Sequence, residues 1–241
     1  MTQKSHFPYF KTYPISSKFT IHLQPSTSYS ELSDEKKNLI QTIWDKEQER
    51  CEGKLHEGAI LSAISFDQKA LIGQFVPYKF FLAQFCEPSL KPDLKIMPVS
   101  LSGITYVEDQ LILAKRSSWV SQSPSCYELA PSGGIRPPGK NLTEVDMKVQ
   151  LLDELKEETG IENSLIKNVK YFVLVHDLKE DGIEICAEIR LKSTGLILSS
   201  SSEYTQVMTI PCSELKPFTK EKVGEFVPLS LLLLKLKNLI D

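Results

Sequence analysis

The segment that most constrains the fold of this chain is a helical pattern over residues 143–159. Thr143 is a typical N-cap residue, and Gly160 is a typical stop for a helix. At about 100° per residue, the apolar side chains gather on one half of the helix, namely those of Val145, Val149, Leu152 and Leu155. This half is predicted to be buried in a layered domain.

The opposite face of the same helix carries three carboxylates. Glu154, Glu157 and Glu158 lie within an arc of roughly 100°. Like charges three and four residues apart repel one another, and a bound divalent cation would relieve that repulsion. Carboxylates are also the hard oxygen ligands that Mg²⁺ prefers. On spacing alone, a metal site and an acidic helix face with lysine partners in solvent both remain open.

Strand and helix patterns alternate along the rest of the chain, which favours an α/β fold. Besides residues 143–159, the predicted helices cover 32–49 and 77–85, with short ones near Ser213 and after Pro228. The predicted strands are residues 59–66, 70–75, 99–107, 110–115, 127–130, 169–175, 183–191 and 204–210. Residues 131–140, rich in proline and glycine, are predicted to be a loop, and residues 87–92 a linker. This linker divides the chain into an accessory α+β unit, residues 1–95, and a main domain, residues 96–241.

The net charge, the apolar runs and the cysteines limit the classes of binding partner and the compartment that we expect for this protein. The net charge of −3 gives no bulk attraction to nucleic acid or to an anionic membrane. The first residues lack the apolar core of a signal peptide, and the longest apolar run, residues 227–240, is too short to span a bilayer. The five cysteines form no CxxC pair and are expected to be reduced thiols. A cytoplasmic protein without a nucleic-acid or membrane partner is therefore predicted.

Residues around the three carboxylates resemble the signature of the Nudix hydrolase family. That signature is glycine, five residues, glutamate, seven residues, then Arg-Glu-apolar-x-Glu-Glu-x-Gly-apolar. The chain has matching residues at Gly139, Glu154, Leu155, Glu157, Glu158, Gly160 and Ile161.

The chain departs from this signature at two positions. Val145 stands where the family has glutamate, and Asp153 stands where it has arginine. The resemblance implies that these two positions brace the loop and helix rather than bind metal. Their joint change predicts a rebuilt brace, and it leaves reduced activity or a catalytically inactive binding module as alternatives.

Two flanking segments extend the resemblance. Residues 127–135, Tyr-Glu-Leu-Ala-Pro-Ser-Gly-Gly-Ile, are similar to the family segment that leads into the signature. They imply a backbone carbonyl ligand for the metal near Ser132 or Gly133. Residues 202–207 resemble the segment that carries a further glutamate, so Glu203 is the candidate for an extra metal ligand or general base. A loop glutamate beside serines is the alternative for Glu203.

A broader likeness covers residues 42–45, 98–107 and 111–118, which resemble a Nudix branch that acts on UDP-sugars. It implies a Nudix α/β/α sandwich with a mixed sheet, and Mg²⁺ or Mn²⁺ as cofactor. It also implies hydrolysis of the diphosphate linkage of a nucleotide sugar such as UDP-glucose, which gives a nucleoside monophosphate and a sugar phosphate. An ADP-ribose or dinucleotide diphosphatase is the alternative within the same class.

Three basic residues are candidates for binding the substrate phosphates. Lys115 and Arg116 end a predicted strand, and Arg136 lies in the glycine-containing loop. For all three, a solvated position without a ligand is the alternative. Residues 1–95 either shape the substrate pocket or form a homodimer interface, and the sequence does not choose between these.

Overall fold

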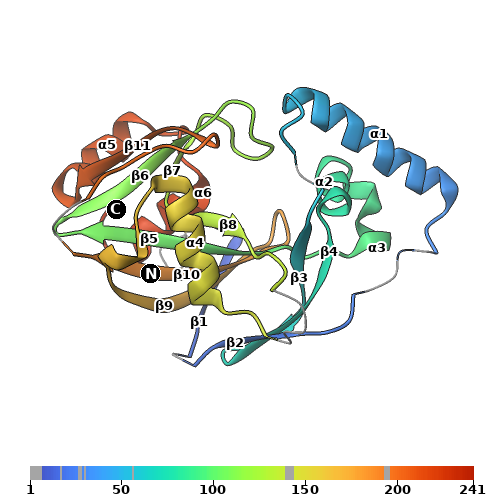
Figure 1. Cartoon of the computed structure of the whole chain (residues 1–241), viewed down its shortest axis with the longest axis horizontal. Helices are drawn as coiled ribbons and strands as arrows, with labels where there is room; N and C mark the ends of the chain where they lie inside the picture. The colour runs from blue at the N-terminus through green and yellow to red at the C-terminus, as the bar shows by residue number, and fades with distance from the viewer. Residues whose placement is uncertain are drawn as a thin grey trace.

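The structure, a computed structural model, describes residues 7–16, 18–26, 29, 31–55, 57–138, 144–192 and 196–241. Within these residues an eight-stranded sheet has the order β1-β9-β10-β5-β6-β11, with β7 paired to β6 and β8 paired to β5 (Figure 1). Among the described residues, strands β10 and β5 of this sheet pair in parallel and its other strand pairs are antiparallel, so the sheet is mixed. Its strands are β1 (Phe10–Pro14), β5 (Val99–Val107), β6 (Gln110–Arg116), β7 (Tyr127–Leu129), β8 (Ser132–Gly134), β9 (Ile166–Asp177), β10 (Gly182–Leu191) and β11 (Tyr204–Pro211).

Helices cover both faces of the large sheet. Helix α4 (Met147–Thr159) packs through Leu151 and Leu155 into one apolar cluster, which also holds Leu101 of β5 and Ile185 of β10. Helices α5 (Leu215–Glu221) and α6 (Pro228–Leu236) pack on the other face, where successive strand residues point the opposite way. The prediction of an α/β fold with a mixed sheet is confirmed.

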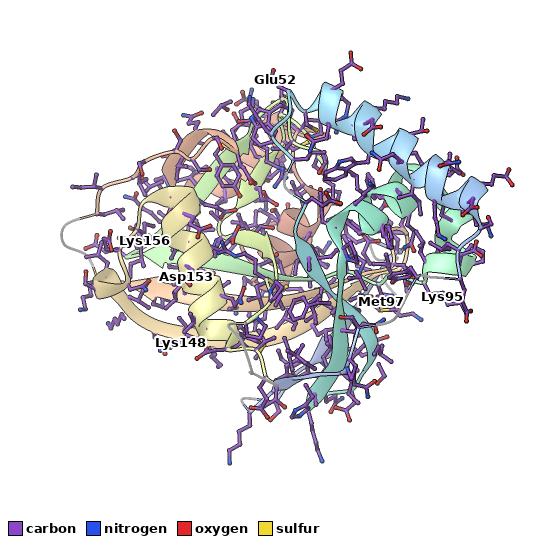
Figure 2. All side chains as sticks on the ribbon, turned by 45° about the vertical axis from the view of Figure 1, so that its right-hand side comes forward. Glu52, Lys95, Met97, Lys148, Asp153 and Lys156 are labelled. Atoms are coloured by element: carbon purple, nitrogen blue, oxygen red, sulfur yellow. The ribbon has the colours of Figure 1, made fainter. Side chains whose placement is uncertain are left out.

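A second, three-stranded sheet lies beside the first, in the order β2 (Thr20–Leu23), β4 (Ala70–Pro77) and β3 (Ala59–Phe66). Helices α1 (Asp34–Arg50), α2 (Tyr78–Cys86) and α3 (Lys91–Leu94) lie on its outer side (Figure 1). At the seam, the Ala63 amide donates to the Met97 carbonyl (2.7 Å), and the Leu61 amide donates to the Ile135 carbonyl (3.2 Å). Figure 2 labels Met97 where the two sheets meet.

Most predicted elements are confirmed, with boundaries shifted by a few residues. The helix predicted over residues 32–49 is α1, and Ser33 caps it by accepting a hydrogen bond from the Lys36 amide (3.3 Å). The hairpin around Asp67 also forms, because the Asp67 carboxylate accepts hydrogen bonds from the two amides that follow the turn. The boundary at residue 95 stays a prediction, and β1 joins the large sheet by pairing with β9.

Two loop predictions are wrong. Ser132–Gly134 form strand β8, because their backbone pairs with residues 100–102 of β5 despite the glycines. The predicted linker instead forms a 3-10 turn, Pro88–Leu90, followed by α3. The side chain of Gln84 holds the segment after α3 in place by donating to the Ile96 carbonyl (2.7 Å) and accepting from the Ile96 amide (3.0 Å).

Helix α4 differs from its prediction at its start and at two side chains. Asp146 is its N-cap, with a carboxylate that accepts hydrogen bonds from the amides of Lys148 and Val149 in the first turn of the helix. Thr143, the predicted N-cap, lies outside the described residues. Val149 is 54% exposed, whereas Leu151 is fully buried. The exposed Lys148, Asp153 and Lys156 mark the solvent side of the helix (Figure 2).

No helix in the described part of the chain has both the length and the apolarity needed to cross a membrane.

Truncating Leu155 to alanine is expected to lower the free energy of unfolding by about 2–5 kcal/mol, because it leaves a cavity between α4 and the sheet. Leu155 is fully buried. Val149→Ala on the same helix is the matched control and should change the free energy by no more than about 0.5 kcal/mol. Urea denaturation followed by circular dichroism measures both, and equal effects would contradict the packing described above.

Candidate active site

The acidic edge of α4 faces β8 and the beginning of β11, at the edge of the large sheet. Along this edge the three predicted carboxylates differ in exposure. Glu157 has a side chain that is 57% exposed, the side chain of Glu154 is 22% exposed, and Glu158 is only 4% exposed. The three residues therefore span an arc that runs from solvent at Glu157 to the buried face of the helix at Glu158. The prediction that Glu158 lies on the face opposite the buried one is wrong, because residue 158 follows Leu151 and Leu155 on the side that packs on the sheet.

Glu158 lies inside the protein with a hydrogen bond at each carboxyl oxygen. The Tyr204 hydroxyl lies 2.9 Å from Oε1, and the Ser132 amide donates to Oε2 at 3.2 Å. Burial raises the pKa of Glu158 well above its usual value, and the charges of Glu154 and Glu128 add to this, while the two hydrogen bonds oppose it. Ser132, predicted as a carbonyl ligand, thus contacts the acidic face through its amide.

Glu154 lies directly against the backbone of Gly133. A Cβ added at Gly133 would overlap the Glu154 carboxyl group, so any other residue there would displace this side chain. Burial raises the pKa of Glu154 to about 7; Arg136 opposes the rise, and Glu157 and Glu203 add to it. The predicted pair of Gly133 and Glu154 is therefore in contact.

Glu157 points outward and pairs with Arg136. Both terminal guanidinium nitrogens lie 3.1 Å from one Glu157 oxygen, and one lies 3.5 Å from Glu154. Gln150 fixes the backbone of Arg136 by accepting from its amide (3.0 Å) and donating to its carbonyl (2.9 Å). The positive charge of Arg136 thus lies beside two of the carboxylates that the sequence predicted to be metal ligands.

The remaining predicted residues separate into two groups. Glu203 is exposed, immediately before β11, and its charge is felt by Glu154. Arg116 points inward and forms an ion pair with Glu128, in which both side chains are at least 86% buried. Lys115 lies on the other side of β6, with its ammonium 4.6 Å from the Tyr127 ring centre and 3.6 Å from Glu225. Arg116 and Lys115 therefore engage protein partners.

Sequence analysis missed four polar side chains beneath the acidic face: Ser102, Glu128, Glu184 and Tyr204. The Tyr204 hydroxyl lies 3.0 Å from Glu128, and Ser102 donates to Glu184 at 2.7 Å. Burial raises the pKa of Glu184 to about 7, and the charge of Glu128 adds to it, while the Ser102 hydrogen bond opposes it. A glutamate inside a short apolar strand, such as Glu128 in β7, was the available signal, because buried carboxylates need partners.

The carboxylate oxygens of the three glutamates are of the type that binds a hard divalent cation, but their present positions do not form a binding site. Among the described residues, no three His, Cys, Asp or Glu side chains converge closely enough to hold a metal ion. Glu157 is turned toward Arg136, and Glu158 is turned toward Tyr204 and Ser132. However, burial first and neighbouring carboxylates second raise the pKa of Glu154 and of Glu158, and a bound cation would oppose both effects.

No protein-family model matches the chain, and no curated protein matches its sequence. Solved structures similar to it include a bifunctional NMN adenylyltransferase/ADP ribose pyrophosphatase from Francisella tularensis, in complex with AMP and a manganese ion. The identity is 15% and the TM-score 0.44, over 65% of this chain and 46% of that one, so this chain spans less than half of that enzyme.

Two further similar structures are covered over almost their whole length. The Nudix domain of Shewanella oneidensis NrtR, in complex with ADP ribose, is 13% identical with a TM-score of 0.44, over 62% of this chain and 94% of that one. A C. elegans Ap4A hydrolase is 14% identical with a TM-score of 0.40, over 59% and 96%. At these values the likeness does not bear on function, which depends on the side chains of the site.

Glu184→Gln is expected to stabilise the protein relative to the wild type increasingly as the pH rises. A carboxyl with a folded-state pKa of about 7, above the usual 4.5, contributes stability that is lost as the pH rises through that value. Glutamine cannot ionise, so the difference in unfolding free energy between variant and wild type should grow by about 2–3 kcal/mol from pH 5 to pH 8.

The control is Glu188→Gln on the same strand. Burial opposes ionisation of Glu188, but Lys237 and Arg190 outweigh it and lower its pKa. Its contribution is lost as the pH falls, so the Glu188→Gln variant should show the opposite pH trend. Urea titrations at several pH values measure both, and a flat difference for Glu184→Gln would contradict the assigned burial.

Proposed function

We propose that this chain hydrolyses the diphosphate linkage of a nucleoside diphosphate derivative with the help of a divalent cation. The observation that carries the proposal is the packing of the Glu154 carboxyl against Gly133, beside Glu158 and Glu157 on one helix face. Because Gly133 has no side chain, the Glu154 carboxyl can lie against the backbone there, which is where a cation and a phosphate group would have to approach. The Nudix-like pattern of the sequence around these residues supports the same reaction.

Mg²⁺ or Mn²⁺ would be held by Glu154, Glu157 and Glu158, with a backbone carbonyl of Ser132 or Gly133. When bound, such an ion neutralises charge on the diphosphate and makes water a stronger nucleophile near neutral pH. Glu154 and Glu158 would offer their carboxyl oxygens to the ion in a largely buried setting, where electrostatic interactions are stronger than in water.

The side chains of this protein have separate roles in the proposed reaction. Glu203 is exposed and near Glu154, and would accept the proton of the attacking water. Of the three predicted phosphate partners we retain Arg136, because its guanidinium is half exposed at the acidic face and can pair with phosphate oxygens. Lys115 and Arg116 already contact Tyr127, Glu225 and Glu128.

Within this class, a nucleotide sugar such as UDP-glucose is the substrate we propose, on the resemblance of residues 98–107 and 111–118. ADP-ribose and dinucleotides also contain a linkage between phosphate groups and are the alternative substrates of the same class. For a nucleotide sugar, the products would be a nucleoside monophosphate and a sugar phosphate. The alternative outside the enzymes is a protein that binds the nucleotide without hydrolysing it. Val145 and Asp153 keep this alternative open, because they replace the glutamate and the arginine that brace the helix in the family signature.

Purified protein is expected to release monophosphates from one group within a panel of UDP-sugars, ADP-sugars, ADP-ribose, dinucleotides and nucleoside triphosphates with Mg²⁺ or Mn²⁺. Coupled phosphatase detection measures the release. Glu157→Gln should lower kcat/KM by at least about 100-fold, because the charge that positions the cation is lost. Glu162→Gln is the matched control: this exposed glutamate beyond α4 pairs with Lys156, so activity should be unchanged.

Chelation should abolish the turnover, and adding Mn²⁺ back should restore it. Binding of a panel member without turnover, by protein shown to be folded, would favour the non-catalytic module. Turnover that survives both chelation and Glu157→Gln would overturn the proposed site.

Arg136→Gln is expected to tighten Mn²⁺ binding while weakening the use of substrate. The guanidinium occupies Glu154 and Glu157 in the present structure, and an exposed ion pair of this kind is worth about 0.2–1 kcal/mol, which predicts up to about a fivefold gain in Mn²⁺ affinity. The KM for the substrate should rise, because a phosphate partner is removed. Calorimetric Mn²⁺ titration and steady-state kinetics separate the two effects, with the exposed Arg190→Gln as control.

A further inference from the structure

We propose that the hydroxyl of Tyr204 is a positioning group that fixes the Glu158 carboxyl in the orientation needed to receive a divalent cation, an inference that rests on the proposed function. Tyr204 is 2% exposed at the first position of β11. Among the described residues, its hydroxyl makes the one hydrogen bond that joins Glu158 of α4 to a side chain of the sheet.

The first step of the argument is the orientation of the carboxyl group. One oxygen of Glu158 lies 2.9 Å from the Tyr204 hydroxyl, and the other accepts from the Ser132 amide at 3.2 Å. Two contacts, one at each oxygen, fix both the position and the plane of a carboxyl group. Each carboxylate oxygen has a further lone pair, so this orientation leaves acceptor capacity for a cation.

The second step is that Tyr204 itself is held firmly. Its hydroxyl lies 3.0 Å from a Glu128 oxygen, and the same oxygen pairs with the buried guanidinium of Arg116. Arg116 is held in turn by the Gln122 carbonyl, to which its Nε donates at 3.1 Å. A buried network of this kind has few alternative arrangements, because each unpaired group would lose its hydrogen bonds inside the protein.

The third step is that the residues at the two altered positions of the helix do not perform this task. Val145 is buried in the apolar cluster under α4, and Asp153 is exposed on its solvent side. Neither makes a hydrogen bond or ion pair with Glu158 in the described part of the chain. The ion pair of Arg116 with Glu128, acting through Tyr204, is therefore the bracing network that the fold provides for Glu158.

The same tyrosine also connects Glu158 to the proposed base. Glu203 directly precedes Tyr204, and the Ser117 amide donates to the Glu203 carbonyl at 2.7 Å. The segment Arg116–Ser117 is therefore joined to the segment Glu203–Tyr204 twice. One link is this backbone hydrogen bond, and the other runs from Arg116 to Tyr204 through Glu128.

The test is the Mn²⁺ affinity of the full chain, measured with Mn²⁺ alone by following free Mn²⁺ with electron paramagnetic resonance. Tyr204→Phe keeps the ring and deletes the hydroxyl, and it should weaken Mn²⁺ binding on the order of 10- to 100-fold, as expected for a hydrogen bond to a charged group. Tyr171→Phe is the matched control, because the Tyr171 hydroxyl is buried with no hydrogen-bond partner in the described structure. Its Mn²⁺ affinity should equal that of the wild type.

A second comparison tests whether Tyr204 acts through Glu158. Tyr204→Phe should cause little further loss of Mn²⁺ affinity when Glu158→Gln is already present, because residues that act as a unit are not additive. Equal losses in both backgrounds would overturn the proposal. In turnover assays, high Mn²⁺ should restore kcat in Tyr204→Phe, whereas a general structural defect would not respond to Mn²⁺.

Circular dichroism melting establishes that each variant is folded. If Tyr204→Phe does not fold, Glu128→Gln replaces it and should weaken Mn²⁺ binding in the same direction. Wild-type Mn²⁺ affinity retained by the folded variant would overturn the positioning role alone. Failure of the wild type itself to bind Mn²⁺ would overturn the proposed function, and the positioning role with it.

Discussion

The arrangement of the site depends on the burial of one carboxyl group by the packing of helix α4. Leu151 and Leu155 must lie against the sheet to bury their apolar surface, and Glu158 follows them on the same face, seven and three residues later. The helix therefore carries Glu158 into the interior, where a carboxyl group without partners would be costly. The Ser132 amide, the Tyr204 hydroxyl and the Arg116–Glu128 pair are the partners that make this burial tolerable.

Helix geometry also sets how far the other two carboxylates are exposed to solvent. Glu154 is partly covered by Gly133, and Glu157 faces solvent and Arg136, so the same residue type has three different environments within five positions. A group near the interior holds its position but ionises with difficulty, while a group in solvent ionises readily and moves. A cation bound at this edge, as proposed, would meet two fixed carboxyl groups and one that can adjust.

The three-stranded sheet and its helices reach this edge through the loop after β6. The Tyr78 hydroxyl of α2 lies 3.1 Å from Ser121, and the Trp119 indole donates to the Ser202 carbonyl at 3.1 Å, next to Glu203. The Lys54 ammonium lies 4.9 Å from the Trp119 ring centre. Elements from residues 1–95 thus support the loop beside the proposed base, which gives this part of the chain a route to influence the site.

The sequence by itself determined the alternation of strands and helices and the helix with its acidic edge, because periodicity is a local property. Gly133 was indicated only by the family resemblance, as a backbone ligand for a metal, and its contact with Glu154 came from the structure. The sequence did not determine that α4 begins at Asp146, that Val149 is exposed while Leu151 is buried, or that Ser132–Gly134 form a strand. Only the tertiary structure decided the partners of Glu158 and the inward direction of Arg116. Those contacts join β6, β7, α4 and β11, and no local pattern specifies which side chains meet when distant segments pack together.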